Sequence, residues 1–78
     1  MKVTLASTRK IVELATPQGT VPARIWEGHT ETGIPVHAYI TRIAAPAEGA
    51  DLSQFDRELQ EHSAPTPEVE AIPLRLIL

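Results

Sequence analysis

Two segments in which apolar and polar residues alternate constrain the fold of this chain more than any other feature. The apolar positions of these segments, residues 21–27 and 34–40, are Val21, Ala23, Ile25, Ile34, Val36, Ala38 and Ile40. An alternation with a period of two residues is typical of a β-strand that buries one face. Gly33 lies between the segments and can adopt the positive φ that closes a hairpin loop. The sequence therefore predicts a β-hairpin.

The length of the hairpin loop decides which side chains share a face, because a slip of one residue turns a whole strand over. A three-residue loop, 31–33, would set Trp26 opposite Ala38 and mix apolar and polar side chains on both faces. A four-residue loop, 30–33, sets Ile25 opposite Ala38 and gathers the aliphatic side chains on one face. We therefore expect the four-residue loop.

This register also predicts a candidate binding face on the opposite side of the hairpin. Its members are Arg24, Trp26, His37 and Tyr39. Platforms for single-stranded nucleic acid combine aromatic side chains of a sheet with arginine, and each stacked base contributes about 1–3 kcal/mol. Only two large aromatic side chains are present in the set, however, and the net charge of −3 disfavours a polyanion. Amphipathic aromatic residues are also common in cores and in protein interfaces.

The segment before the hairpin has two interpretations. Residues 10–15 are short and rich in β-branched side chains, which favours a strand, and Pro17 and Gly19 then fit a turn. The apolar residues of 7–15 would also fit one face of a helix that begins at Ser7. We expect the strand.

A helix is predicted in the second half of the chain, between two loops at residues 44–50 and 63–67. Asp51 can serve as its N-cap, and Leu52, Phe55 and Leu59 recur at helical spacing. This narrow apolar stripe is typical of a helix that packs on a sheet. The prolines of 63–67 predict an extended linker after the helix.

The last ten residues are the most apolar part of the chain and predict a final strand. Pro73 cannot donate to a ladder, so we expect pairing from about Leu74 onward, at an edge of the sheet. An apolar edge invites strand addition from another chain. The residues Leu74, Leu76 and Leu78 are therefore a candidate edge for a homodimer.

Together these segments predict one α+β domain over residues 1–78. Its chain order is β-β-β-α-β, with a mainly antiparallel sheet of about four strands and one helix packed on one face. The chain has 78 residues and no cysteine, so disulfides are excluded, and a core of this size supplies only about 3–5 kcal/mol of net stability. It contains neither a signal-peptide-like start nor a membrane-length apolar run, so we expect a soluble, cytoplasmic protein with no membrane partner.

No motif in the sequence indicates catalysis. Phosphate-binding loops, dinucleotide fingerprints, zinc ligand sets and nucleophile elbows are missing, and His29, His37 and His62 are widely spaced. We therefore predict no enzymatic activity, no metal and no cofactor. The first hypothesis is that this small, bacterial-type protein is a non-enzymatic interaction module, which presents a sheet face or edge strand to a protein partner or to itself. The alternative is weak binding of single-stranded nucleic acid.

Overall fold

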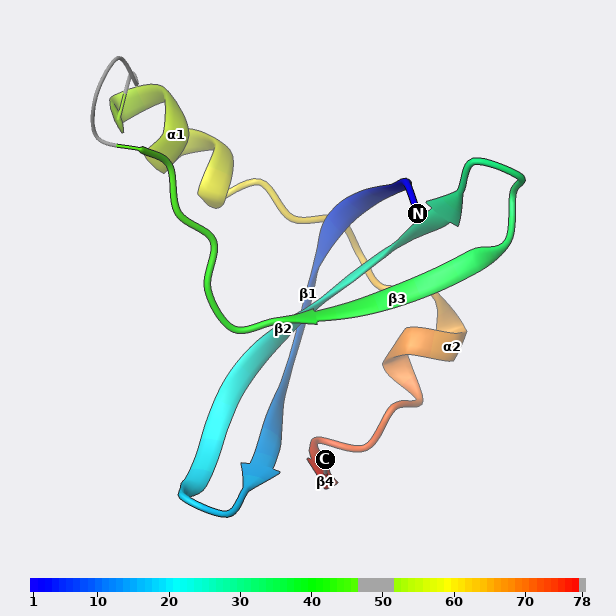
Figure 1. Cartoon of the computed structure of the whole chain (residues 1–78), viewed down its shortest axis with the longest axis vertical. Coiled ribbons are helices and arrows are strands. Elements are labelled where there is room, and N and C mark those ends of the chain that lie inside the picture. The colour runs from blue at the N-terminus through cyan, green and yellow to red at the C-terminus, as the bar shows by residue number, and fades with distance from the viewer. Residues whose placement is uncertain (47–51, 78) are drawn as a thin grey trace.

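The computed structural model describes residues 1–46 and 52–77, which form a four-stranded sheet and two short helices (Figure 1). In chain order the elements are β1 (Val3–Thr16), β2 (Gly19–Thr30), β3 (Pro35–Ile40), α1 (Leu52–Leu59), α2 (Pro67–Glu70) and β4 (Arg75–Ile77). The strand order is β3-β2-β1-β4, with antiparallel pairing except between β4 and β1. The expected α+β class with a mainly antiparallel sheet is confirmed.

The strand interpretation of residues 7–15 is correct, because they lie within β1. This strand pairs with β2 through a tight turn in which Thr16 lies opposite Gly19. The hydroxyl of Thr16 donates a hydrogen bond to the Gly19 carbonyl oxygen at 2.7 Å and accepts one from the Gln18 amide at 3.2 Å. Gly19 has a φ of 126°, a conformation that other residues rarely adopt.

A bulge divides β1, because its pairing with β2 shifts between Ser7 and Ile11. The Thr8 side chain fills this irregularity and is fully buried. Its hydroxyl donates to the Ile25 carbonyl oxygen at 2.7 Å and accepts from the Lys10 amide at 3.2 Å. The hydroxyl thus takes the place of ladder hydrogen bonds that the bulge interrupts.

Replacing Thr8 by valine is expected to destabilise the fold by about 1–3 kcal/mol, since the Ile25 carbonyl and the partly buried Lys10 amide then lose this partner. The side-chain volume hardly changes, so a cavity does not contribute. Urea unfolding followed by Trp26 fluorescence measures the loss. Thr20→Val, at an exposed position of β2, is the matched control. Equal stability of the two variants would contradict a structural role for the Thr8 hydroxyl.

The predicted four-residue hairpin loop is wrong. The structure pairs Ile25 with Tyr39 and Trp26 with Ala38, which is the register of the three-residue loop, 31–33. Local hydrogen bonds explain the outcome. The Thr30 amide donates to the Ile34 carbonyl oxygen at 2.9 Å, and the Thr30 hydroxyl accepts from the Ile34 amide at 3.1 Å.

Gly33 completes the three-residue loop with a φ of 91°. A glycine in this conformation is typical of three-residue hairpin loops. The stabilisation gained from this favoured turn therefore exceeds what would be gained by placing all the small aliphatic side chains on one face.

The core lies on the face of the sheet that α2 covers. Its buried apolar residues are Val12, Leu14, Ala23, Ile25 and Val69, with Ile72 and Leu76 packed against them. The helix expected after residue 50, α1, borders the sheet through the half-buried Leu59 but adds no fully buried side chain to this core. The expected N-cap, Asp51, lies outside the described residues.

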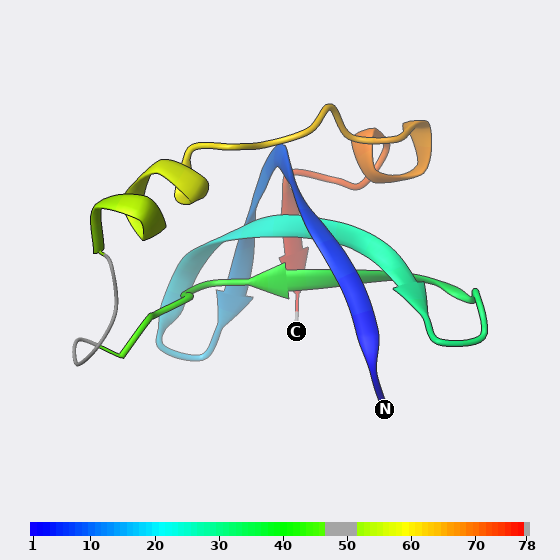
Figure 2. The same cartoon turned by 90° about the horizontal axis from the view of Figure 1, so that it is seen from above.

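The helix that covers the core is α2, which contributes the fully buried Val69. The segment after the linker was expected to be a strand from Val69 onward. The structure instead places Pro67 at the start of α2, where a proline costs no hydrogen bond and its fixed φ suits the first turn. Figure 2 shows α2, and the segment that joins it to α1, on the far side of β2 from β3.

The final strand lies at an edge of the sheet, as predicted. Pairing begins where it was expected, since the Glu13 amide of β1 donates to the Leu74 carbonyl oxygen at 2.7 Å. β4 runs parallel to β1, which is the one parallel pairing among the described strands and agrees with a mainly antiparallel sheet. Leu76 packs against the core, and Leu74 is exposed. Leu78 lies outside the described residues.

Candidate functional site

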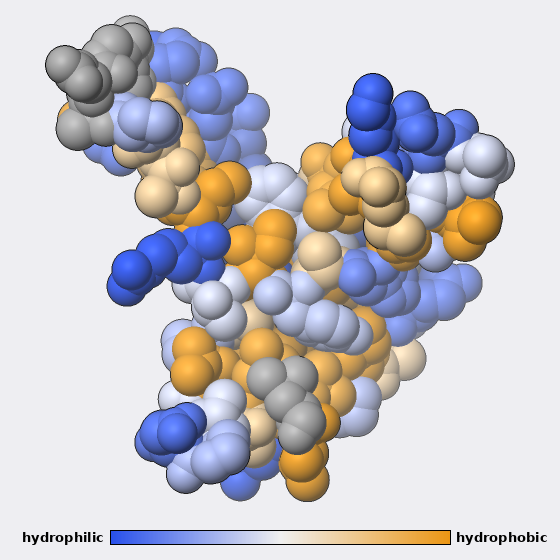
Figure 3. Space-filling model, in the orientation of Figure 1, coloured by the Kyte–Doolittle hydropathy of each residue, from blue (hydrophilic) through white to orange (hydrophobic). Residues whose placement is uncertain are grey.

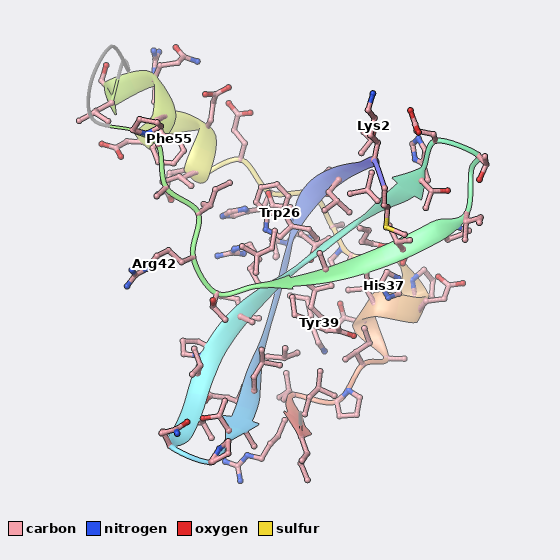
Figure 4. The ribbon with its side chains drawn as sticks, viewed as in Figure 1. Lys2, Trp26, His37, Tyr39, Arg42 and Phe55 are labelled. Carbon is pink, nitrogen blue, oxygen red and sulfur yellow. The ribbon has the colours of Figure 1, made fainter. Side chains whose placement is uncertain are left out.

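The observed register separates the four residues of the predicted binding face. Arg24 and Trp26 lie on one face of the hairpin, whereas Tyr39 lies opposite Ile25 and His37 opposite Glu27 on the other face. Figure 4 shows Trp26 on the side toward α1, and His37 and Tyr39 on the side toward α2. The sheet therefore does not assemble the aromatic and basic platform that the sequence predicted.

Arg24 also has a structural partner. Its Nη1 atom donates a hydrogen bond to the Thr8 carbonyl oxygen at 2.9 Å, which ties β2 to the bulge of β1. A guanidinium held in this way retains fewer donors for a phosphate group. Arg42 extends away from the sheet into solvent (Figure 4). For the nucleic-acid hypothesis, the aromatic platform is therefore missing, and Arg24 already uses one of its donors within the sheet.

A groove of about 260 Å³ lies between the sheet and α1. Its apolar walls are formed by Ile11, Trp26, Ile40, Ile43 and Leu59. Hydrophobic side chains are visible along this junction between α1 and the sheet (Figure 3). Pockets that hold small-molecule ligands usually enclose about 300–1,000 Å³. The groove is thus large enough for a side chain of a partner but small for a cofactor.

One serine and one histidine meet in this groove. The Oγ atom of Ser7 lies 3.2 Å from Nδ1 of His62 and donates a hydrogen bond to the Glu61 carbonyl oxygen at 2.8 Å. Because the shorter bond directs the only hydroxyl proton to a carbonyl, the histidine is not placed to remove it. The Ser63 amide also donates to the Ser7 carbonyl oxygen at 3.0 Å. We interpret these contacts as an anchor that holds the segment after α1 on β1.

Across the sheet, Glu27 anchors the start of α2. Its two carboxylate oxygens accept hydrogen bonds from the Thr66 hydroxyl at 2.6 Å and from the Thr66 amide at 2.9 Å. The hydroxyl contact is the main cause that lowers the pKa of Glu27 below its ordinary value; burial opposes the shift, and the Thr66 amide and nearby His37 reinforce it. The carboxylate thus stabilises the turn into the helix that carries Val69.

Glu27→Gln is expected to lower stability at neutral pH by about 1 kcal/mol, after allowance for solvent screening of this half-buried group. Because the pKa is lowered in the folded state, wild type has this stabilisation above the ordinary glutamate pKa and loses it as the pH falls through the lowered value. The difference in stability between the two proteins should begin to shrink as the pH falls below the ordinary glutamate pKa of about 4.3, and it should vanish below the lowered pKa of Glu27. Urea unfolding at a series of pH values measures the difference. Glu31→Gln in the exposed loop is the control, and a constant gap for Glu27→Gln would contradict this assignment.

A further feature with binding potential is the outer edge of β3. Thr30 and Ile34 form a hydrogen-bonded pair, and in an antiparallel ladder such pairs alternate with pairs that point their backbone groups outward. The alternation directs the N–H and C=O groups of His37 and Tyr39 away from β2. β3 has no neighbour on that side in the described part of the chain. These backbone groups are therefore available to another strand.

This edge also lacks the charges that normally protect an edge strand. No Asp, Glu, Lys or Arg occurs between Glu31 and Arg42. Natural proteins commonly blunt an exposed edge with charged side chains, especially lysine. The sequence-based prediction did not include this edge, although the segment without charged residues between Glu31 and Arg42 can be read from the sequence.

The other edges of the sheet are more protected. Beside the bulge of β1, the Arg9 amide donates to the Ser63 carbonyl oxygen at 3.1 Å, and β4 pairs with β1 further along. β4 itself has only three residues, one of which is Arg75. The predicted dimer edge at Leu74, Leu76 and Leu78 remains a prediction, but it offers a shorter ladder than β3.

The fold and these sites define a small α+β domain with an open, mostly antiparallel sheet. The chain matches no protein-family model, no curated protein and no solved structure among those with which it was compared. No helix in residues 1–46 and 52–77 is long and apolar enough to cross a membrane. Across the same residues, no three His, Asp or Glu side chains are grouped so that they could hold a metal ion.

Proposed function

We propose that the protein is a non-enzymatic interaction module that binds by accepting an extended strand at the outer edge of β3. The supporting observation is the three-residue loop, which directs the backbone groups of His37 and Tyr39 outward along a strand without charged side chains. Strand addition draws its affinity from main-chain hydrogen bonds. Alternate side chains of the added strand then supply specificity.

The side chains beside this edge suit an apolar strand. Val36, Ala38 and Ile40 are half-buried on the Trp26 side, and Tyr39 is exposed on the other side. An added strand would therefore extend an aliphatic surface on one face and meet an aromatic ring on the opposite face. The groove beside α1 is close to Ile40 and offers space for a further apolar side chain of the partner.

Amide-resolved NMR can test this function with a neutral eight-residue peptide of alternating threonine and valine, capped at both ends. Titration into dilute protein should shift and protect the amides of His37 and Tyr39, while the amide of Ala38 is already protected by β2. Tyr39→Pro removes one outward N–H and should abolish the response, whereas Tyr39→Val keeps the N–H and should retain it. Tyr39→Pro is tolerable for the fold because the lost donor is not used within the sheet.

Two outcomes would contradict the proposal. One is a peptide response at β4 or in the groove that leaves the amides of β3 unchanged. The other is salt-sensitive quenching of Trp26 by an oligothymidine together with no response to peptide, which would support nucleic-acid binding instead.

A further inference from the structure

We infer that the strand accepted by β3 is β3 of a second copy of this chain, in an antiparallel pair with its two-fold axis at Ala38. This inference rests on the proposed function and names its partner. Around such an axis, His37 of one copy lies opposite Tyr39 of the other. Both residues direct their backbone groups outward, so the two symmetry-related pairs form about four hydrogen bonds.

The ends of the ladder fit the same register. Thr41, the first residue after β3, lies opposite Pro35 of the second copy, and continuing the alternation of β3 to Thr41 turns its amide toward the proline carbonyl oxygen. Pro35 has no N–H, so no donor at this position is left without a partner. Beyond Pro35, Ile34 turns into the hairpin loop, where its amide is bonded to Thr30. The self-paired ladder thus uses the full length of β3 and stops at the loop.

The side chains are also self-complementary in this register. On the Trp26 side, Val36 lies opposite Ile40 of the second copy, and Ala38 lies opposite itself. On the other side, His37 and Tyr39 form a cross-strand pair. No formal charge on the strand opposes its own copy, whereas like charges directly opposite each other destabilise a pair.

A second copy also suits the small core of this protein. The described residues bury five hydrophobic side chains and leave ten large hydrophobic ones exposed, which is a weak core for a chain without disulfides. Small scaffolds of this kind are often stabilised by oligomerisation, and two-fold dimers are the commonest form. Ile34, Tyr39 and Ile43, which lie in or beside β3, belong to the exposed set.

Cysteine cross-linking tests the two-fold axis directly, because the chain has no natural cysteine. In Ala38→Cys the two thiols should face each other with Cβ atoms about 4.5–5.5 Å apart, close enough for a disulfide after a small adjustment. Under mild oxidation of dilute protein, Ala38→Cys should dimerise at least about tenfold faster than Gln18→Cys, whose cysteine lies in the exposed turn between β1 and β2. Equal rates would overturn the inference.

Sedimentation of the unmodified chain provides the second measurement, which does not depend on the folding of Ala38→Cys. Wild type and Tyr39→Val should form dimers with increasing concentration, and Tyr39→Pro should remain monomeric. A wild type that stays monomeric at about 1 mM would overturn the inference, since this concentration corresponds to only about −4 kcal/mol of association. If that monomer still binds the threonine-valine peptide, strand addition stands and self-pairing fails. If it binds neither, the proposed function fails as well.

Discussion

Ile25→Ala is expected to leave the chain largely unfolded at room temperature. Ile25 is 0% exposed and lies at the centre of the core, between the strands and α2. Truncation of a buried isoleucine to alanine costs about 2–5 kcal/mol, because apolar contacts are lost and a cavity remains. This cost is comparable to the whole net stability of about 3–5 kcal/mol that a core of this size supplies.

Circular dichroism and urea unfolding measure the effect of Ile25→Ala. The matched control is Ile34→Ala, which makes the same change at a side chain that is 60% exposed and should shift stability by at most about 0.5 kcal/mol. If the two variants had similar midpoints, Ile25 would not be the centre of the core.

The second large effect is expected for Gly28→Ala. A Cβ atom at Gly28 would overlap the carbonyl oxygen of Thr4 in the neighbouring strand β1. Because the obstacle is backbone, no side-chain rotation can relieve the clash, and β1 and β2 must separate locally. We expect a loss at the upper end of, or beyond, the roughly 1–3 kcal/mol typical of overpacking.

Thermal unfolding of Gly28→Ala beside His29→Ala separates this clash from a general effect of alanine. His29 is the next residue of β2 and its side chain is exposed, so its replacement should be nearly neutral. A Gly28→Ala protein with the melting temperature of wild type would mean that the two backbones do not approach each other so closely.

The strands were predictable because their signal is local. Alternation at Val21, Ala23 and Ile25 and the β-branched content of residues 10–15 identify strands without knowledge of their partners. Pro73 likewise predicted an edge position for the final strand, because a residue without an N–H cannot donate a hydrogen bond to a ladder in any fold.

The register and the covering helix were not predictable from the same patterns. The hydrophobic pattern favoured a loop that gathers aliphatic residues, whereas the hydrogen bonds of Thr30 and the positive φ of Gly33 select the shorter loop. The predicted binding face of Arg24, Trp26, His37 and Tyr39 depended on the four-residue loop. It does not form in the observed register, because a slip of one residue turns the side chains of a whole strand to the other face. Similarly, the apolar stripe of α1 suggested core packing, but Val69 in the proline-flanked α2 occupies that place.

The contact between Thr8 and Ile25 could not be read from sequence, because it depends on a bulge that no residue pattern marked. The uncharged stretch of β3 was visible, but its importance appears only once β3 is known to lie at the edge of the sheet.

The central claim is the pairing of β2 with β3, since the outward direction of the His37 and Tyr39 backbone groups follows from it. Cross-strand NOEs between Hα protons measure it directly, because residues opposite each other in a non-hydrogen-bonded pair have Cα atoms only about 4.5 Å apart. We predict strong Hα–Hα NOEs from Ile25 to Tyr39 and from Glu27 to His37. An NOE of this kind from Ile25 to Ala38 would contradict the register, and the binding edge with it.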